Sequence, residues 1–467
     1  MMKTIDTDSC LCVSAVAVIL CLSSLVAAAA ENPEDGPIRI IKQENTDLER
    51  FIPADGNTVY NAAGLLRSWP KEGPKELWRA NSLCGKSAVV EAGGRAFTMA
   101  QIDDKQYGVC LDPLTGKILW KALLLPKGNT HFQGGPVASP VVDGDRVYFI
   151  PYDNEKDPFK PHCPVVCVKT GGTELWREND NVWATEGSTP LVIGDVLYVA
   201  SSHVDTLLMA VDKMTGRRLW AAKCPMPGPW KDKVPFTTGC SLTYQKVAGI
   251  PQIITAVYYS QELLGFHAGK GELMWRWKLP KAPINGLIST PVAVGPRLFV
   301  SAGDGGNFSA CLEMVPKDGK IELTVLYSSE KLQTNFLNTV AIYDGAVFGF
   351  GSGENRQAIQ CTNFADGNLL WQNEGPDWYR RQQLIVADGL IFALTRKGEV
   401  ALLEASRKGY KELGRVYPGM AMGLQQQPTL ANGRLYIRGE DTIVCYQVAE
   451  KMTPAGGEAA CQQLSGE

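Results

Sequence analysis

An eleven-residue phrase that recurs along the chain constrains the fold more than any other feature of this 467-residue sequence. Its clearest copy is Ala-Val-Asp-Lys-Met-Thr-Gly-Arg-Arg-Leu-Trp, residues 210–220. Residues 110–120 keep the Asp, Thr, Gly and Trp at the same steps, 265–275 and 361–371 keep the Gly and the Trp, and 167–176 is one residue shorter. The phrase predicts a strand that ends in a tight turn, followed by a strand that brings a Trp to a buried place. One such unit cannot bury its own apolar face, so the copies must stack on one another.

A second repeated signal consists of short apolar strands interrupted by tight turns. Many of these turns contain Asp-Gly or Asn-Gly, which are strong hairpin signals. The turn glycines follow one another at intervals of 44 to 55 residues: Gly94, Gly144, Gly194, Gly249, Gly295, Gly345, Gly389 and Gly433. Eight units of about four strands at this spacing indicate the blades of a β-propeller. A solenoid of four-stranded units is the alternative architecture.

The eighth unit lacks a Trp-bearing strand of its own, because the chain after its third strand runs into the C-terminal tail. Residues 73–78, Gly-Pro-Lys-Glu-Leu-Trp, have the form of that strand but follow no hairpin. We therefore predict an all-β, eight-bladed β-propeller of four-stranded antiparallel blades, with the last blade closed by the N-terminal strand around Trp78. Such closure removes the open sheet edges that invite aggregation. The copies after Cys311 and near Leu403 have no Trp, which predicts less regular fifth and seventh blades.

The N-terminal region has the layout of a secretory signal. An apolar core, residues 11–26, is followed by small residues that end at Ala30, where we expect cleavage. Lys3 is outweighed by Asp6 and Asp8, which leaves an uncleaved membrane anchor as the alternative. No other apolar run approaches the roughly 20 residues that span a bilayer. We therefore expect a periplasmic or extracellular protein with four segments: signal peptide 1–30, N-terminal extension 31–68, propeller 69–449 and C-terminal tail 450–467.

The composition is that of a globular protein with no preference for polyanions. Hydrophobic residues make up 45% of the chain and charged residues 20%, which is far from the composition of a disordered protein. The formal net charge is -3 at pH 7. This balance gives no electrostatic reason to expect binding to nucleic acid.

The recurring phrase resembles the tryptophan-docking repeat, Ala-x-Asp-x-x-x-Gly-x-x-x-Trp, of pyrroloquinoline-quinone-type (PQQ-like) propellers, over about residues 69–449. In that family the Trp lies between adjacent blades and the small residue at step one makes room for it. The chain is more similar to the cofactor-free BamB-like proteins than to the quinone-dependent dehydrogenases, which are longer and carry an adjacent Cys-Cys pair. This sequence has neither that pair nor a Cys-x-x-Cys-His haem motif. The resemblance assigns structural docking roles to Trp78, Trp120, Trp176, Trp220, Trp275 and Trp371.

The resemblance implies an exported, non-catalytic binding or assembly platform that needs no cofactor. A quinone-dependent dehydrogenase holding PQQ with calcium is one alternative. A sugar-binding or sugar-modifying surface protein is another. The sequence contains no Gly-x-Ser-x-Gly, no His-Glu-x-x-His and no complete phosphate-binding loop, so we predict no catalytic residues.

Three of the thirteen cysteines, Cys10, Cys12 and Cys21, lie in the signal segment, and repeat position explains five more. Five occupy step one of the phrase, where other copies have Ala or Gly, and are expected to be small buried apolar residues: Cys110, Cys167, Cys311, Cys361 and Cys445. Cys224 and Cys240 flank a proline-rich insertion and are candidates for a disulfide in an oxidising compartment. His162 and Cys163 have no second ligand cluster nearby, so we predict no metal site.

The segments that connect the outer strand of one blade to the inner strand of the next are expected to meet near the axis on one face. They carry amides, two Arg, a Glu, a His and three Trp, a set that suits a polar ligand or a segment of a partner. The alternative is that these groups only hydrate a central channel. We expect a protein, polar small-molecule or glycan partner for a monomeric chain. The candidate ligand-binding residues are His131, Gln133, Trp183, Glu186, Trp230, Asn335, Asn338, Trp378, Arg380, Arg381, Gln383 and Gln426.

Overall fold

The computed structural model divides the chain into two units, Met1–Arg39 and Ile40–Glu467, and the fold described below belongs to the second unit. The residues it describes are 47–128, 134–152, 163–179, 187–201, 206–223, 240–257, 260–280, 289–303, 307–318, 320–334, 339–351, 358–373, 383–395, 397–420 and 428–452.

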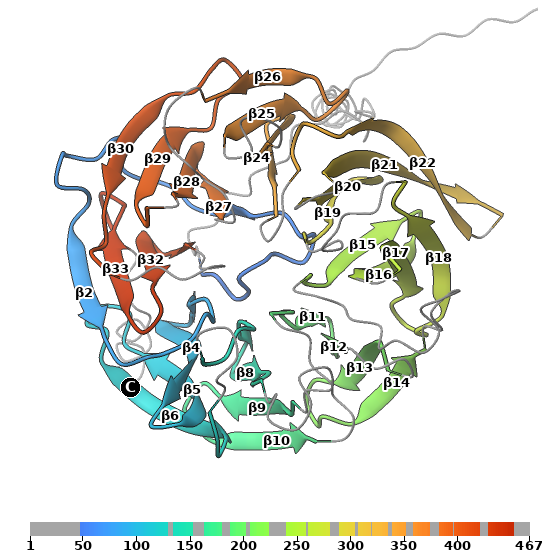
Figure 1. Ribbon diagram of the computed structural model, residues 1–467. Coiled ribbons are helices and arrows are strands. Elements are labelled where there is room, and N and C mark those ends of the chain that lie inside the picture. Colours follow the sequence, from blue (N-terminus) through green and yellow to red (C-terminus); the bar gives the residue numbers. More distant parts are fainter. Residues whose placement is uncertain are drawn as a thin grey trace, which may run out of the picture. The chain divides into compact units, whose positions relative to one another are not determined.

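Eight antiparallel four-stranded sheets follow one another around a ring, as the sequence predicts, and one of them gains a fifth strand (Figure 1). Blades one to four are β3–β6 (Val90–Ala92, Arg95–Ile102, Lys105–Leu111, Ile118–Leu125), β7–β10 (Val141–Asp143, Arg146–Phe149, Val165–Lys169, Glu174–Glu178), β11–β14 (Leu191–Ile193, Val196–Ala200, Leu208–Asp212, Arg218–Ala222) and β15–β18 (Thr243–Val247, Ile250–Val257, Glu262–His267, Leu273–Lys278). Blades five to seven are β19–β22 (Val292–Val294, Arg297–Ala302, Phe308–Lys317, Lys320–Ser329), β23–β26 (Ala341–Tyr343, Ala346–Phe350, Ile359–Asn363, Leu369–Gln372) and β27–β30 (Leu384–Ala387, Leu390–Leu394, Val400–Glu404, Glu412–Val416). Blade eight combines β31–β33 (Thr429–Ala431, Arg434–Arg438, Ile443–Gln447) with β2 (Glu76–Ala80), and β1 (Val59–Tyr60) is the fifth strand, added to blade seven.

The prediction that the N-terminal strand closes the last blade is confirmed. β2 pairs antiparallel with β33, and Trp78 lies opposite Cys445. Figure 1 shows β2, coloured for the start of the chain, beside the strands coloured for its end. The two ends of the propeller are thus joined through backbone hydrogen bonds within one sheet.

The turn in the recurring phrase explains its Asp, Thr and Gly. The carboxylate of Asp212 accepts hydrogen bonds from the backbone N–H groups of Met214 and Thr215, both at 2.9 Å, and from the Thr215 hydroxyl at 3.0 Å. Gly216 has a φ of +74°, which a residue with a Cβ adopts only with strain. A β-bulge then shifts the outer strand so that Trp220 lies opposite Ala210.

In four copies of the phrase, its Gly also packs against the Trp of the preceding blade: Gly116, Gly172, Gly216 and Gly271. A Cβ added to Gly216 would lie 2.6 Å from the Trp176 ring, and one added to Gly116 would lie 2.5 Å from the Trp78 ring. Four indole nitrogens donate to backbone carbonyl oxygens in the turn of the next blade: Trp78 to Pro113 (2.8 Å), Trp120 to Thr170 (2.9 Å), Trp176 to Lys213 (3.2 Å) and Trp371 to Ser406 (2.7 Å). The phrase therefore links neighbouring blades, because its Gly contacts the Trp of the preceding blade and its Trp contacts the turn of the next blade.

Five of the six predicted docking residues contact the turn of the next blade, and Trp275 is the exception. Trp78, Trp275 and Trp371 are buried, whereas Trp120, Trp176 and Trp220 are only partly buried. Trp275 lies over its own blade, where a Cβ on Gly265 would be 2.0 Å from the ring. In that blade the small residue at step one makes room for the Trp, as the resemblance implied.

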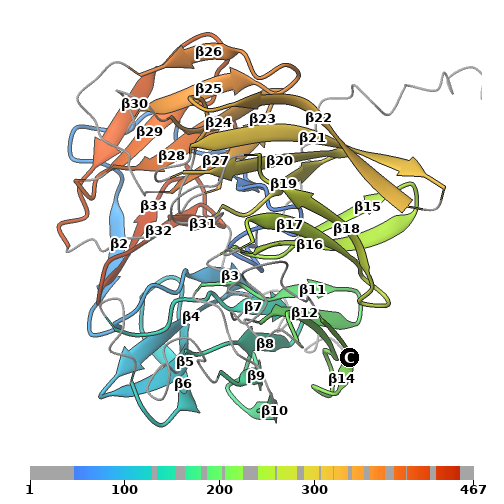
Figure 2. The same cartoon turned by 45° about the vertical axis from the view of Figure 1, so that its right-hand side comes forward.

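The fifth blade replaces the docking Trp with Tyr327. This residue pairs opposite Cys311, packs on Gly367 of the next blade and donates its hydroxyl to the Phe364 carbonyl at 2.8 Å. The hairpin of β21 and β22 has strands of ten residues each and extends outward from the ring (Figure 2). The predicted irregularity of this blade is therefore a longer hairpin with a substituted aromatic residue.

The seventh blade receives its docking Trp from outside the blade. Gly414 occupies the register position opposite Leu402, where other blades have an aromatic residue. Trp69, which precedes β2, fills that space: its ring centroid lies 5.9 Å from that of Phe392, and a Cβ on Gly414 would be 2.6 Å from the Trp69 Cβ. The N-terminal segment thus supplies the aromatic side chain that the local sequence lacks.

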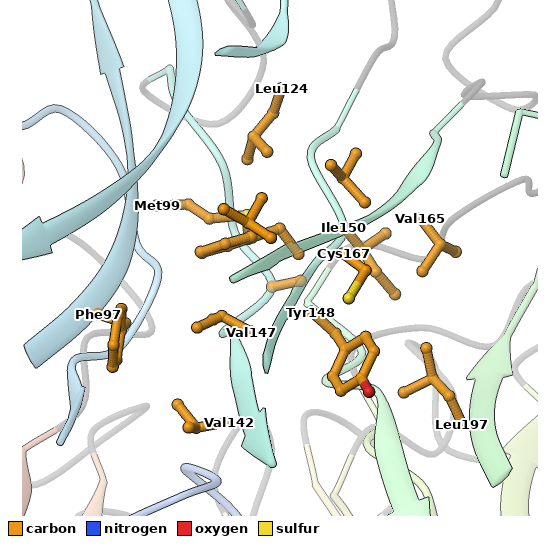
Figure 3. Close-up of a cluster of buried hydrophobic side chains, with 14 of the residues drawn as sticks. Phe97, Met99, Leu124, Val142, Val147, Tyr148, Ile150, Val165, Cys167 and Leu197 are labelled. Atoms are coloured by element: carbon orange, nitrogen blue, oxygen red, sulfur yellow. The ribbon is translucent and has the colours of Figure 1, made fainter. Parts of the chain in front are cut away.

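The interiors between blades are apolar, and the step-one cysteines belong to them. Figure 3 shows Cys167 among Val165, Tyr148 and Ile150, in a cluster that continues from the first blade into the third. All five step-one cysteines are free and fully buried. Burial raises the pKa of the Cys110 and Cys361 thiols to about 12. The prediction that these cysteines are small apolar core residues is confirmed.

Candidate functional site

The axis of the ring is occupied by a stretch of the chain's own N-terminal region, residues 47–60, which we call the axial strap (Figure 1). It contacts the innermost strands of successive blades in turn. In most blades the donor is the backbone N–H of one residue at the equivalent position of the inner strand. The pairs are Glu91 N to Leu48 O (3.1 Å), Val142 N to Glu49 O (2.9 Å), Tyr244 N to Ala54 O (2.6 Å), Ala293 N to Asp55 O (2.8 Å) and Val386 N to Thr58 O (2.9 Å).

The side chain of Arg50 contacts blade three and adds a second contact with blade four. The guanidinium donates to five backbone carbonyl oxygens: those of Pro190 (2.8 Å), Thr189 (3.3 Å), Leu242 (3.0 Å), Pro53 (2.9 Å) and Ile52. An arginine side chain has five N–H groups, so all are used. Burial lowers the pKa of Arg50 to about 9. This cation has a structural role and no hydrogen left for a ligand.

The contact with blade six depends on an asparagine side chain. Asn57 Nδ2 donates to the Ile342 carbonyl at 2.9 Å, and Asn57 Oδ1 accepts from the Ile342 N–H at 2.9 Å. The primary amide thus reproduces the hydrogen bonds that a neighbouring β-strand would make. The next residues form β1, which pairs in parallel with β27 of blade seven.

The strap begins at the junction of blades eight and one, next to a buried ionic cluster. Glu91 and Arg434 are fully buried and form an ion pair, with Arg434 Nε at 3.0 Å from Glu91 Oε2. The Tyr436 hydroxyl donates to the same carboxylate, and Asn432 Nδ2 donates to both Glu91 (3.1 Å) and Asp47 of the strap (2.6 Å). Burial alone would lower the pKa of Arg434, but the hydrogen bonds and the charge of Glu91 raise it overall. The charged groups of this cluster satisfy one another.

A ring of polar side chains lies one or two residues before the start of the inner strands. We call it the polar collar, and it comprises Ser139, Thr189, Ser241, Thr290, Thr339 and Gln383, all buried. Its hydroxyls link neighbouring blades: Ala88 N donates to Ser139 Oγ (3.0 Å), and Ser241 N donates to Thr290 Oγ1 (3.0 Å). The collar is three residues from the strap along each strand, or about 10 Å. The chain leads from the collar directly into the connecting segments.

Gln383 is the one predicted ligand-binding residue that the structure describes. It occupies the collar position of blade seven and is 2% exposed, and its side-chain oxygen has no hydrogen-bond partner among the described atoms. The other eleven lie outside the described residues: His131, Gln133, Trp183, Glu186, Trp230, Asn335, Asn338, Trp378, Arg380, Arg381 and Gln426. Their meeting at one face stays a prediction.

Three further predictions concern cysteines, metals and membranes. Cys240 is a free and fully buried thiol, whereas Cys224 lies outside the described residues, so their disulfide stays a prediction. No group of three or more His, Cys, Asp and Glu side chains among the described residues is arranged to hold a metal ion. No helix in the described part of the chain is long and apolar enough to cross a membrane.

Sequence reasoning missed the strap and most of the collar. Arg50 and Asn57 lie in a stretch with weak periodicity, and the groups they bind are backbone groups, which leave no mark in the sequence of the blades. The collar did leave a signal: Ser or Thr precedes Pro at the start of several inner strands, as at 139–140, 189–190 and 290–291. Aligning these positions on the turn glycines would have identified it.

Comparison with known proteins agrees with this architecture. Residues 43–222 match the model of the family described as outer membrane protein assembly factor BamB. No curated protein matches the sequence. Three solved structures share the fold at 11–14% identity: BamB from Moraxella catarrhalis (14% identity; TM-score 0.55; 81% of this chain and 99% of that chain covered), quinohemoprotein alcohol dehydrogenase from Comamonas testosteroni (11%; 0.61; 88% and 82%) and Sqt1 from Saccharomyces cerevisiae (11%; 0.50; 82% and 100%).

Proposed function

We propose that this eight-bladed propeller, whose residues 43–222 match the BamB family model, is an exported, non-catalytic platform that binds a protein partner on the face formed by its connecting segments. The observation that carries the proposal is the occupation of the axis by the strap. The strap uses backbone donors of the inner strands, and Arg50 has all five of its N–H groups bonded within the protein. Recognition of a partner then falls to the side chains of the connecting segments.

The matching family supports an assembly role. Its description names an outer membrane protein assembly factor, which also supports export as the destination of this chain. The connecting segments contain Trp378, Arg380 and Arg381 in close succession. Tryptophan and arginine are the residues that most often dominate the binding energy of protein interfaces.

Site-specific photo-crosslinking in the full-length protein tests which face binds. A crosslinking residue at position 381 should capture a partner from the exported fraction, whereas one at Gly144, an exposed turn at the opposite end of an inner strand, should not. The captured partner, once purified, should bind the wild-type protein and lose at least about tenfold in affinity for the Arg380→Ala, Arg381→Ala double variant. Equal capture from both positions, or unchanged affinity of the double variant, would contradict the proposal.

A quinone-dependent dehydrogenase is the competing function, because the quinohemoprotein alcohol dehydrogenase shares the fold with a TM-score of 0.61. The described axial residues do not fit an anionic quinone with calcium. Arg50 has no free donor, and the described part of the chain holds no cluster of acidic or His side chains for a cation. Adding the quinone, calcium and a redox dye to the purified protein tests this directly: sustained oxidation of an alcohol or sugar would overturn the binding-platform proposal. A glycan array tests the third reading, a sugar-binding surface.

A further inference from the structure

We propose that the ring axis is a peptide-binding site, and that the axial strap is its ligand, supplied by the same chain. The ligand class is an extended peptide that offers backbone acceptors to the inner strands and carries an Arg seven positions before an Asn. This inference concerns the axis and does not depend on the partner proposed for the connecting segments.

The backbone contacts resemble those of a bound peptide more than those of a packed domain segment. Five inner strands present the N–H of the same strand position, and each donates to a strap carbonyl at 2.6–3.1 Å. Recognition of an extended peptide through backbone hydrogen bonds to strand edges is a recurrent binding mode. Here the edges of several sheets contribute, in the order in which the strap passes them.

Side chains of the strap add selectivity for sequence. Arg50 fits a cage of carbonyl oxygens from blades three and four and from the strap itself, and a shorter or uncharged side chain would leave buried carbonyls without donors. Asn57 satisfies both backbone groups of Ile342. Close approach also requires a glycine between them: a Cβ on Gly56, whose φ is +80°, would lie 2.1 Å from the Pro291 carbonyl oxygen.

The covalent connection between the strap and the ring is exposed. After Trp69 the chain turns through Lys71 and Glu72, both exposed, and then enters β2 of blade eight. A cut in this turn separates residues 47–71 from the ring without breaking any of the contacts described above. The site can therefore be tested in a protein that has folded with its ligand in place.

The experiment uses the full-length protein with a protease recognition sequence inserted between Lys71 and Glu72. After cleavage, the N-terminal fragment should remain with the ring during gel filtration, and a fluorescent peptide of residues 47–71 should exchange into the complex. Unlabelled peptide carrying Arg50→Ala should compete at least about tenfold more weakly than the wild-type peptide. Peptide carrying Arg67→Ala should compete as well as wild type, because Arg67 is 61% exposed and pairs only at the surface with Asp388.

Two results would overturn the inference. One is equal competition by the Arg50→Ala and Arg67→Ala peptides. The other is immediate loss of the cleaved fragment from a ring that keeps its thermal stability. If the cleaved protein aggregates, hydrogen exchange on the intact protein provides the test. Asn57→Ala should increase the exchange rate of the Ile342 amide, whereas Arg67→Ala should not change it. Equal protection of that amide in both variants would refute the recognition by Asn57.

Discussion

Replacement of Trp69 by Ala tests the finding that the N-terminal segment supplies the docking residue of blade seven. Trp69 is 7% exposed and packs on Phe392 with a ring separation of 5.9 Å and an angle of 49°. Trp371, a docking residue within its own blade, has the same arrangement with Phe348 at 6.1 Å and 48°. The two aromatic pairs should therefore contribute similarly to stability through packing.

The magnitude follows from burial and hydrogen bonding. Removal of a buried Trp side chain costs about 3–5 kcal/mol. The indole nitrogen of Trp371 donates to the Ser406 carbonyl at 2.7 Å, whereas that of Trp69 has no acceptor among the described atoms. We therefore expect Trp69→Ala to fall near the lower end, about 3 kcal/mol, and Trp371→Ala to cost about 1 kcal/mol more.

Urea denaturation followed by circular dichroism measures both changes, with the difference in midpoint converted through the common slope. Tyr417→Ala is the control, because this aromatic residue is 63% exposed and its removal should change stability by less than about 0.5 kcal/mol. A cost below about 1 kcal/mol for Trp69→Ala would refute the assignment of this residue to the docking position.

Three other substitutions test the docking turn, the buried cluster and the strap. Gly116→Ala should destabilise the protein by more than about 1 kcal/mol, because its Cβ would meet the Trp78 ring at 2.5 Å; Gly93→Ala, which shares a positive φ but has open space around it, should cost less in the same urea titration. Glu91→Gln should cost about 3–5 kcal/mol, since it leaves the guanidinium of a fully buried ion pair without its counter-charge, and calorimetry should show a lower unfolding temperature. Glu49→Gln should stabilise the protein at pH 7. Burial, and then two nearby carboxylates, raise the pKa of Glu49, so its charged form destabilises the native state at pH values above the folded pKa. The gain in unfolding free energy from Glu49→Gln should vanish at pH values below the ordinary pKa of 4.5. An equal gain at about pH 4 would contradict the argument.

The blades could be predicted because most of them repeat the same local pattern of turn residues and Trp at fixed positions in the sequence. The Asp, Thr and Gly of the phrase build a turn from hydrogen bonds within six residues, as Asp212 shows, and the Trp follows at a fixed distance. Closure through Trp78 followed from counting strands. The step-one cysteines followed from the register, since a position filled elsewhere by Ala210 or Gly265 has to be small.

The strap could not be predicted by the same reasoning. Its hydrogen-bond partners are backbone N–H groups, which every non-proline residue possesses, so the sequence of the blades does not reveal them. Trp69 was missed because it reaches blade seven from a distant part of the chain, and the β-bulge that places Gly414 opposite Leu402 is visible only in the register of the strands. For the candidate site, the sequence named Gln383 as a ligand-binding residue, which stays a prediction, and its place in a buried collar depends on the packing of neighbouring blades.

The route of the strap sets an order of events for a chain that is made from its N-terminus. Residues 47–60 are synthesised before every one of their partners, which extend from Glu91 to Asn432. Individual blades can form as they emerge, whereas the strap carbonyls lack their donors until the inner strands that supply the N–H groups have been synthesised. A chain that stops before blade eight therefore loses both the partners of β2 and the Asn432 contact of the strap, so that synthesis must run almost to its end before the centre of the ring can be sealed.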